Sequence, residues 1–185
     1  DDLLIEIQTK NLSAIKNKLG KLLSTNQVRL VYPISQVKWI VYVSDSGKFI
    51  KKRRSPKKGK LTDLFVEMVH LPSLINHQNF SFEVLLIEEE EHRCNDGKGS
   101  WRKRGVSTKD RKLVQVFDRV VFENRTDFLK ILPDTLEYPF TNKDFAKKLG
   151  VSIRLAQKIT YCLRKMNVLT VTGKKKRALL FSISK

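Results

Sequence analysis

The chain has 185 residues, of which 37 are Lys or Arg and 19 are Asp or Glu, for a formal net charge of +18. This length predicts two small folded units with modest cores, and the apolar fraction of 41% is ordinary for a folded protein. Repulsion between the many positive charges destabilises a compact fold, and binding to a polyanionic partner would reduce this repulsion. No apolar run approaches the roughly 20 residues of a spanning helix, so no membrane partner is expected.

The chain begins with Asp1 and shows neither an initiator Met nor a signal-type apolar stretch, so we expect it to be part of a longer protein. Its two cysteines, Cys94 and Cys162, lie far apart and have no Cys-x-x-Cys spacing. This argues against a disulfide framework or a zinc ribbon. It fits a reducing compartment, and we expect a cytoplasmic, nucleoid-associated protein.

The first segment, residues 1–47, is expected to be an α/β piece. Residues 3–9 alternate enough for a half-buried strand that places Glu6 and Gln8 on one face. Helical spacing follows from Asn11, and residues 28–31 and 39–43 are expected to be further strands. The last of these leads into a Ser-Asp-Ser-Gly turn suited to a hairpin.

Residues 48–60 are strongly basic and contain Pro and Gly, which predicts an exposed loop or linker. Residues 61–135 are expected to form a mixed α/β middle region. In order, it holds a short helix over 61–70, a strand over 80–87, a loop over 95–105 and a helix over 108–122. Four glutamates at 88–91 are interpreted as a solvated strand end that pairs with basic loops, with a metal site as the alternative.

The loop of the middle region combines a large aromatic face with three cations, at Trp101, Arg102, Lys103 and Arg104. Such a group suits phosphate contact or stacking on an unpaired base. The alternative is that the indole ring closes over the core.

The last segment, residues 136–185, has the most specific pattern. Thr141 and Asp144 predict a capping box, Gly150 a turn after a short helix, and Ser152 the cap of a second helix. The outer face of that second helix is expected to carry Arg154, Gln157, Lys158, Tyr161, Arg164 and Lys165. Strands over 168–171 and 178–183 would frame a hairpin whose tip carries Lys174, Lys175, Lys176 and Arg177.

On these features, residues 140–184 resemble a winged helix-turn-helix domain. The family places its second helix in the major groove and its wing on the backbone or in the minor groove. The resemblance therefore implies binding to double-stranded DNA, with Arg and Gln at base edges and Lys at phosphates. A domain for protein contacts is the alternative, and RNA ranks lower because this architecture suits a B-form duplex.

The strand, helix and strand at the N-terminus, with Glu6-Ile7-Gln8 on the first strand, resemble the second part of the PD-(D/E)xK nuclease core. The resemblance implies a Mg²⁺-dependent DNA endonuclease in which Asp2 and Glu6 hold the metal and Gln8 orients the water. Gln8 stands where the family usually has Lys, and Lys10 is the candidate to supply that charge. Asp2 is only four residues before Glu6, so we expect the family's first acidic ligand upstream of Asp1.

The sequence thus predicts an α+β, or mixed α/β, protein: a partial restriction-endonuclease-like βαβ piece followed by a C-terminal winged helix-turn-helix. The first functional hypothesis is a metal-dependent DNA nuclease, or a fragment of one, delivered to duplex DNA by the winged helix. The alternative is a non-catalytic DNA-binding regulator whose N-terminal part is a scaffold or the dimerisation unit of a homodimer.

Overall fold

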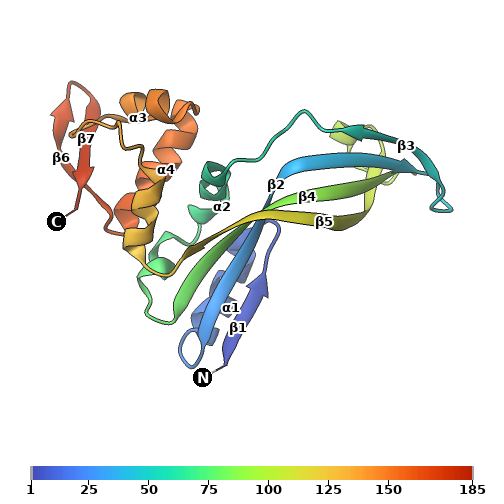
Figure 1. Ribbon diagram of the computed structural model, residues 1–185, viewed down its shortest axis with the longest axis horizontal. Helices are drawn as coiled ribbons and strands as arrows, with labels where there is room; N and C mark the ends of the chain where they lie inside the picture. Colours follow the sequence, from blue (N-terminus) through green and yellow to red (C-terminus); the bar gives the residue numbers. More distant parts are fainter. Residues whose placement is uncertain (1, 185) are drawn as a thin grey trace. The chain divides into compact units, whose positions relative to one another are not determined.

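The computed structural model describes residues 2–184, apart from the side chain of Lys103. It is a mixed α/β structure with a five-stranded and a two-stranded sheet (Figure 1). The strands are β1 (Leu3–Ile7), β2 (Gln27–Val43), β3 (Phe49–Arg54), β4 (Phe80–Asn95), β5 (Val106–Phe122), β6 (Leu169–Lys175) and β7 (Ala178–Ile183). The α-helices are α1 (Lys16–Leu22), α2 (Phe65–Met68), α3 (Asn142–Leu149) and α4 (Ile153–Lys165). The 3₁₀ helices are η1 (Leu12–Ile15), η2 (Leu61–Leu64), η3 (Pro72–Asn76), η4 (Trp101–Lys103) and η5 (Arg125–Ile131).

Contacts group the chain into two compact units. Unit 1 takes residues 1–32, 62–84 and 120–185, and unit 2 takes residues 33–61 and 85–119. The long strands β2, β4 and β5 each give one part to either unit, so the units are built from interleaved segments. The division into consecutive segments 1–47, 48–60, 61–135 and 136–185 stays a prediction. None of the described helices is long and apolar enough to cross a bilayer.

The N-terminal strand-helix-strand prediction is confirmed in unit 1. β1 pairs in parallel with the start of β2, from Leu3 opposite Gln27 to Ile7 opposite Val31. The connection runs through η1 and α1, as parallel neighbours require a crossover rather than a tight turn (Figure 1). Apolar side chains on the inner side of this connection are buried, namely Leu12, Ile15, Leu19 and Leu23.

The C-terminal part of unit 1 folds around an aromatic cluster. The ring centroid of Phe140 lies 5.2 Å from that of Phe145 and 5.8 Å from that of Phe181. The backbones of Phe140 and Phe181 also exchange two hydrogen bonds, of 3.0 and 2.9 Å. The segment before α3 therefore lies beside the β6–β7 hairpin, and the helices and the hairpin share one core.

The structure corrects the prediction for residues 108–122, which form strand β5 and not a helix. Leu113, Val114 and Phe117 fit helical spacing, but all three are exposed and none belongs to a buried helical face. Hydrogen bonds to β4, which no local pattern reveals, hold this segment extended. The β-prone Val and Phe side chains of the segment agree with the observed state.

The basic segment 48–60 is also not a linker throughout, because β3 pairs antiparallel with β2 from Trp39 opposite Arg54 to Val43 opposite Phe49. The expected strands at 28–31 and 39–43 are parts of the single strand β2. The turn between β2 and β3 lies where the Ser-Asp-Ser-Gly sequence predicts it, with Gly47 at φ 81°.

The expected strand end at the glutamates is wrong as well, because β4 continues through them to Asn95. Glu89 and Glu91 are buried, and the glutamates pair with cations of the strands β2, β3 and β4, whereas the sequence predicts pairing with basic loops. Lys38 Nζ lies 2.6 Å from a Glu89 oxygen, and Arg93 Nη2 lies 2.7 Å from a Glu91 oxygen. Burial raises the pKa of Glu91, but the nearby cations more than offset this and leave the pKa lowered. The Glu91 carboxylate therefore stabilises unit 2 as a charged group.

Thiol reactivity tests the packing of both units. Cys94 and Cys162 are free and buried, and burial raises the pKa of Cys162 to about 12. Because the thiolate is the reactive form, we expect neither thiol to react with Ellman's reagent within minutes at about pH 8 in the native protein, and both to react after denaturation. The Cys94→Ser and Cys162→Ser variants assign any signal, and fast reaction of a native thiol would contradict this packing.

Candidate nucleic-acid interface

Local capping signals position the two C-terminal helices. The Thr141 hydroxyl accepts from the backbone N–H of Asp144, and the Asp144 carboxylate accepts from the backbone N–H of Thr141, at 3.3 and 3.0 Å. α3 ends at Gly150, whose φ of 62° is in the left-handed region, and Ser152 caps α4 by accepting from Leu155 N–H. The predicted capping box, turn and cap are all confirmed.

α4 has a buried side and an exposed side. Its buried residues are Ala156, Ile159, Thr160, Cys162 and Leu163. Five of the six residues predicted for the outer face are exposed, namely Arg154, Gln157, Tyr161, Arg164 and Lys165. Lys158 is half-buried.

α4 contacts α2 and η3 within unit 1 through two hydrogen bonds. Lys158 Nζ donates to the backbone carbonyl of Val66 at 3.3 Å, and the Asn76 amide donates to the backbone carbonyl of Lys165 at 3.3 Å. These contacts hold α4 at its middle, through Lys158, and at its C-terminal end, through Lys165. The exposed side of the helix remains open to solvent.

The β6–β7 hairpin carries the second cationic group. Lys174, Lys175, Lys176 and Arg177 are exposed where the predicted wing tip places them, and Lys176 sits in the turn at φ 54°. The hairpin register runs from Leu169 opposite Ile183 to Lys175 opposite Ala178. From residue 145 to 185, the sequence holds eleven Lys or Arg and no Asp or Glu. No carboxylate of this segment can neutralise either group of cations.

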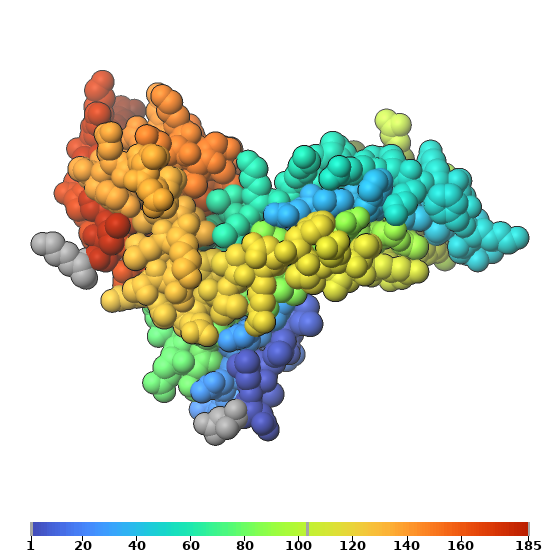
Figure 2. All heavy atoms as spheres, viewed as in Figure 1, coloured from blue at the N-terminus to red at the C-terminus, as the bar shows by residue number. Residues whose placement is uncertain are grey.

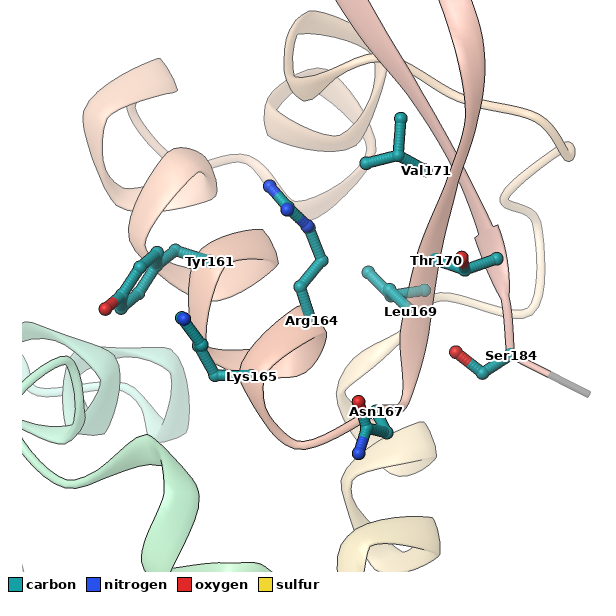
Figure 3. Close-up of a pocket in the computed structure, with 8 residues that line it drawn as sticks. All are labelled: Tyr161, Arg164, Lys165, Asn167, Leu169, Thr170, Val171 and Ser184. Carbon is teal, nitrogen blue, oxygen red and sulfur yellow. The ribbon is translucent and has the colours of Figure 1, made fainter.

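A hollow of about 510 Å³ lies between α4 and β6 (Figure 3). Its lining residues are Tyr161, Arg164, Lys165, Asn167, Leu169, Thr170, Val171 and Ser184. In Figure 3 the side chain of Arg164 extends from α4 across this hollow. The lining residues carry cations, hydroxyl groups and a side-chain amide, and none of them is acidic. Such hydrogen-bond donors bind phosphate oxygens. The sequence alone did not indicate the contributions of Asn167 and Thr170, because they lie outside the α4 stripe.

The N-terminal motif of unit 1 also forms a cluster. Gln8 Nε2 donates to one Glu6 oxygen at 3.0 Å, so the two side chains share a face as predicted. Lys18 Nζ, on α1, donates to the other oxygen at 2.6 Å. The Lys18 hydrogen bond is the main cause that lowers the pKa of Glu6. Sequence reasoning missed Lys18, which is twelve residues from Glu6 and becomes its neighbour only through the crossover.

The structure does not bring the other predicted nuclease residues together in the same way. Asp2 and Lys10 are exposed, and among the described residues Glu6 belongs to no group of three metal-ligating side chains. Both Glu6 oxygens already accept hydrogen bonds. One neutralised carboxylate is a poor donor set for Mg²⁺, which is usually held by one or two carboxylates together with substrate phosphates. The described residues around Glu6 therefore do not form a fitting Mg²⁺ site.

The Trp101 loop lies in unit 2, and Trp101 is exposed rather than packed over a core. The Arg102 guanidinium stands 5.4 Å from its ring centroid, and Arg104 is exposed. The predicted role of Lys103 concerns a side chain outside the described part of the chain. Two further cation–π pairs, Lys51 with Tyr42 and Lys52 with Trp39, follow from the pairing of β3 with β2.

Comparison with known proteins places this fold in a family. The profile described as "Domain of unknown function (DUF8091)" matches residues 1–123. The chain belongs to the DUF8091 family. The matched DUF8091 part ends just before η5, so α3, α4 and the hairpin lie beyond it.

The chain is also similar to a Treponema pallidum (strain Nichols) protein described as "Uncharacterized protein". The two are 31% identical over 182 residues, which cover 98% of this chain and 71% of that relative. The similarity therefore includes both the DUF8091 part and the C-terminal segment. No solved structure matches the chain.

The capping box at α3 gives a test of stability. We expect Asp144→Ala to lower the free energy of unfolding by about 1 kcal/mol at neutral pH, measured by urea denaturation. The hydrogen bonds from Thr141 lower the pKa of Asp144 in the folded protein. The Asp144 carboxylate therefore stabilises the fold fully above the pKa of about 3.9 that it has in the unfolded chain. This stabilisation is lost as the pH falls through the lower pKa of the folded state. The variant should therefore lose less stability than the parent on acidification. Asp134→Ala, at an exposed aspartate outside a cap, is the control, and equal losses in both variants would contradict the assignment.

Proposed function

We propose that this protein binds double-stranded DNA through α4 and the β6–β7 hairpin. The observation that carries the proposal is the exposed cationic side of α4 together with four exposed cations at the hairpin tip of the same unit. No acidic residue occurs in the 41 residues that form these surfaces. A duplex, with its closely spaced phosphates, is a partner that neutralises both groups at once.

The order of α3, a tight turn, α4 and a hairpin supports a winged helix-turn-helix assignment for residues 140–184. The bridge between Phe140 and Phe181 adds a short third strand beside the hairpin, which supports the same assignment. In this arrangement α4 enters the major groove, and Arg154 and Gln157 can reach base edges. The hairpin tip contacts the backbone or the minor groove.

The side-chain types of this surface favour nucleic acid over a protein partner. Ile153 and Tyr161 are the large apolar or aromatic side chains of α4 that are strongly exposed, and the same helix exposes the cations Arg154, Arg164 and Lys165. Protein interfaces are usually depleted of Lys at their centres. The contact of Lys158 with the Val66 carbonyl withdraws one predicted cation from the groove-facing side, so we assign it to holding α4 on α2.

Salt dependence of binding tests the proposal. We expect replacement of Lys174, Lys175 and Lys176 by Ala to weaken binding to unrelated duplexes about equally, by at least about tenfold near 100 mM salt. The slope of log K against log salt should become shallower by up to about 3, because each lost phosphate contact removes about 0.9. Fluorescence anisotropy with labelled duplexes of about 20 base pairs measures both quantities.

The matched control replaces Lys10, Lys16 and Lys21, three exposed lysines near α1, by Ala. It removes the same net charge, and we expect a much smaller loss of affinity with an unchanged slope. Arg154→Ala should reduce the preference between duplex sequences more than it reduces overall affinity. If the hairpin variant and Arg154→Ala both bind like the parent, DNA does not dock on this surface.

A metal-dependent nuclease is the second candidate function. The parallel β1–α1–β2 unit and the placement of Glu6 beside Gln8 favour it, and Lys18 supplies near Glu6 the positive charge that Gln8 lacks. Since Glu6 is the one carboxylate of the Glu6–Gln8–Lys18 cluster and is already paired, this function requires further acidic ligands from elsewhere. A non-catalytic DNA-binding regulator requires no acidic ligands, and the geometry of the Glu6 cluster favours this regulator over the nuclease.

A cleavage assay distinguishes the two functions. We expect no Glu6-dependent cleavage when the chain, in its longest available form, is incubated with duplex DNA and Mg²⁺. Glu6→Ala is compared with Glu137→Ala, which removes an exposed carboxylate outside the cluster. Cleavage that survives Glu137→Ala and disappears in Glu6→Ala would establish the nuclease and overturn the regulator.

A further inference from the structure

β5 is an edge strand with exposed apolar side chains on both of its faces. In the described part of the sheet it follows β4 at the end of the strand order, with no strand on its other side. Leu113 and Phe117 are 62% and 42% exposed, and Val114 and Val116, on the opposite face, are 52% and 43% exposed. β5, yellow in Figure 2, lies at the surface in that view. Edge strands can add another strand through their backbone groups, and in β5 the N–H groups of Arg111 and Arg119 donate to the Asp110 and Asp118 side chains, each at 2.7 Å.

The sequence of this edge is complementary to itself about Gln115. In an antiparallel pair with a twofold axis through Gln115, Val114 would lie opposite Val116 of the second copy, and Leu113 would lie opposite Phe117. At the next step outward, Lys112 would lie opposite Asp118. Each of these pairs occurs twice by symmetry. Apolar residues thus meet apolar residues, and a cation meets an anion.

We propose that β5 pairs with β5 of a second copy of this chain, antiparallel and centred on Gln115, and so joins two copies into a homodimer. Opposed residues share a face of the sheet, so Lys112, Val114, Val116 and Asp118 line one face of the joined edge. The central residue pairs with itself through its two side-chain amides. The proposal concerns unit 2 alone and does not rest on DNA binding.

The register centred on Val114 and the edge of β3 are less suitable. An axis at Val116 would place Val114 opposite Asp118 and Leu113 opposite Arg119, so apolar residues would face charged ones. A twofold axis at Val114 places Asp110 opposite Asp118 and Lys109 opposite Arg119, two repulsive pairs beside few apolar ones. The register centred on Gln115 has one like-charge pair, Arg111 with Arg119, and Arg111 Nη2 lies 3.4 Å from a Glu91 oxygen that partly neutralises it. β3 ends in Lys51, Lys52, Arg53 and Arg54, which repel a second copy.

The oligomeric state of the whole chain tests the proposal first. Sedimentation equilibrium up to about 100 μM should show a monomer–dimer equilibrium, as expected for a small interface. Leu113→Lys should weaken dimerisation about tenfold or more. Ile50→Lys, at a 59% exposed residue of β3, is the matched control and should leave the dimer unchanged. A chain that stays monomeric over this range, or a dimer that only Ile50→Lys weakens, would overturn the proposal.

A charge exchange tests the pairing of Lys112 with Asp118. Lys112→Asp and Asp118→Lys each place like charges opposite each other twice, so each should weaken the dimer. The double variant restores opposite charges and should regain most of the lost affinity. Additive losses in the double variant would overturn this pairing, and circular dichroism of each variant shows whether it is folded.

Disulfide trapping tests the register. Opposed residues of antiparallel strands have Cα atoms about 4.5 to 5.5 Å apart, within disulfide range, so Gln115→Cys should cross-link to itself in a glutathione buffer. Val114→Cys would face residue 116 of the second copy, which places its own two copies more than about 7 Å apart, and should cross-link poorly. The parent, whose cysteines are both buried, is the blank. Faster cross-linking at position 114 than at 115 would overturn the register.

Discussion

The uneven distribution of acidic residues along a chain of net charge +18 is the constraint on which this structure depends. Four of the 19 acidic residues are consecutive in β4. Three of them, Glu89, Glu90 and Glu91, pair with the unit 2 cations Lys38, Lys52 and Arg93. These pairs neutralise and stabilise the sheet. From residue 145 onward the sequence has no acidic residue, and every described cation there except Lys158 stays exposed, so a bound anion would neutralise these cations.

The C-terminal part could be predicted from the sequence because its signals are local. Thr141 with Asp144, Gly150, and Ser152 each specify a helix end within a few residues, and the apolar spacing of α4 then selects its buried side. The exposed DNA-binding candidates on the outer face of α4 could be predicted directly from that spacing. The half-burial of Lys158 did not, because its partner, the Val66 carbonyl, lies 92 residues away.

The unit 2 strands and the Glu6 cluster were harder to predict because distant residues decide them. Leu113, Val114 and Phe117 satisfy a helical pattern as well as a strand pattern, and only the presence of β4 beside them selects the strand. β3 is basic enough to resemble a linker, yet its pairing with β2 holds it extended. Lys18 reaches Glu6 through the parallel crossover, which a spacing argument limited to β1 does not include.

The family match covers residues 1–123 and leaves the C-terminal helices and hairpin outside it. The DUF8091 part, residues 1–123, contains the large sheet, and unit 1 joins its α2 and η3 to α4 through the contacts of Lys158 and Asn76. These contacts leave the opposite side of α4 exposed. One side of α4 thus holds the helix in unit 1, and the proposed contact with the DNA groove uses the other side.

Hydrogen exchange measured by mass spectrometry, with and without a duplex of about 20 base pairs, tests the central claim most directly. The account predicts slower exchange on DNA binding in peptides that cover α4 and the β6–β7 hairpin, with little change in peptides that cover α1. Protection confined to other segments, or no protection at a DNA concentration that saturates binding, would contradict it.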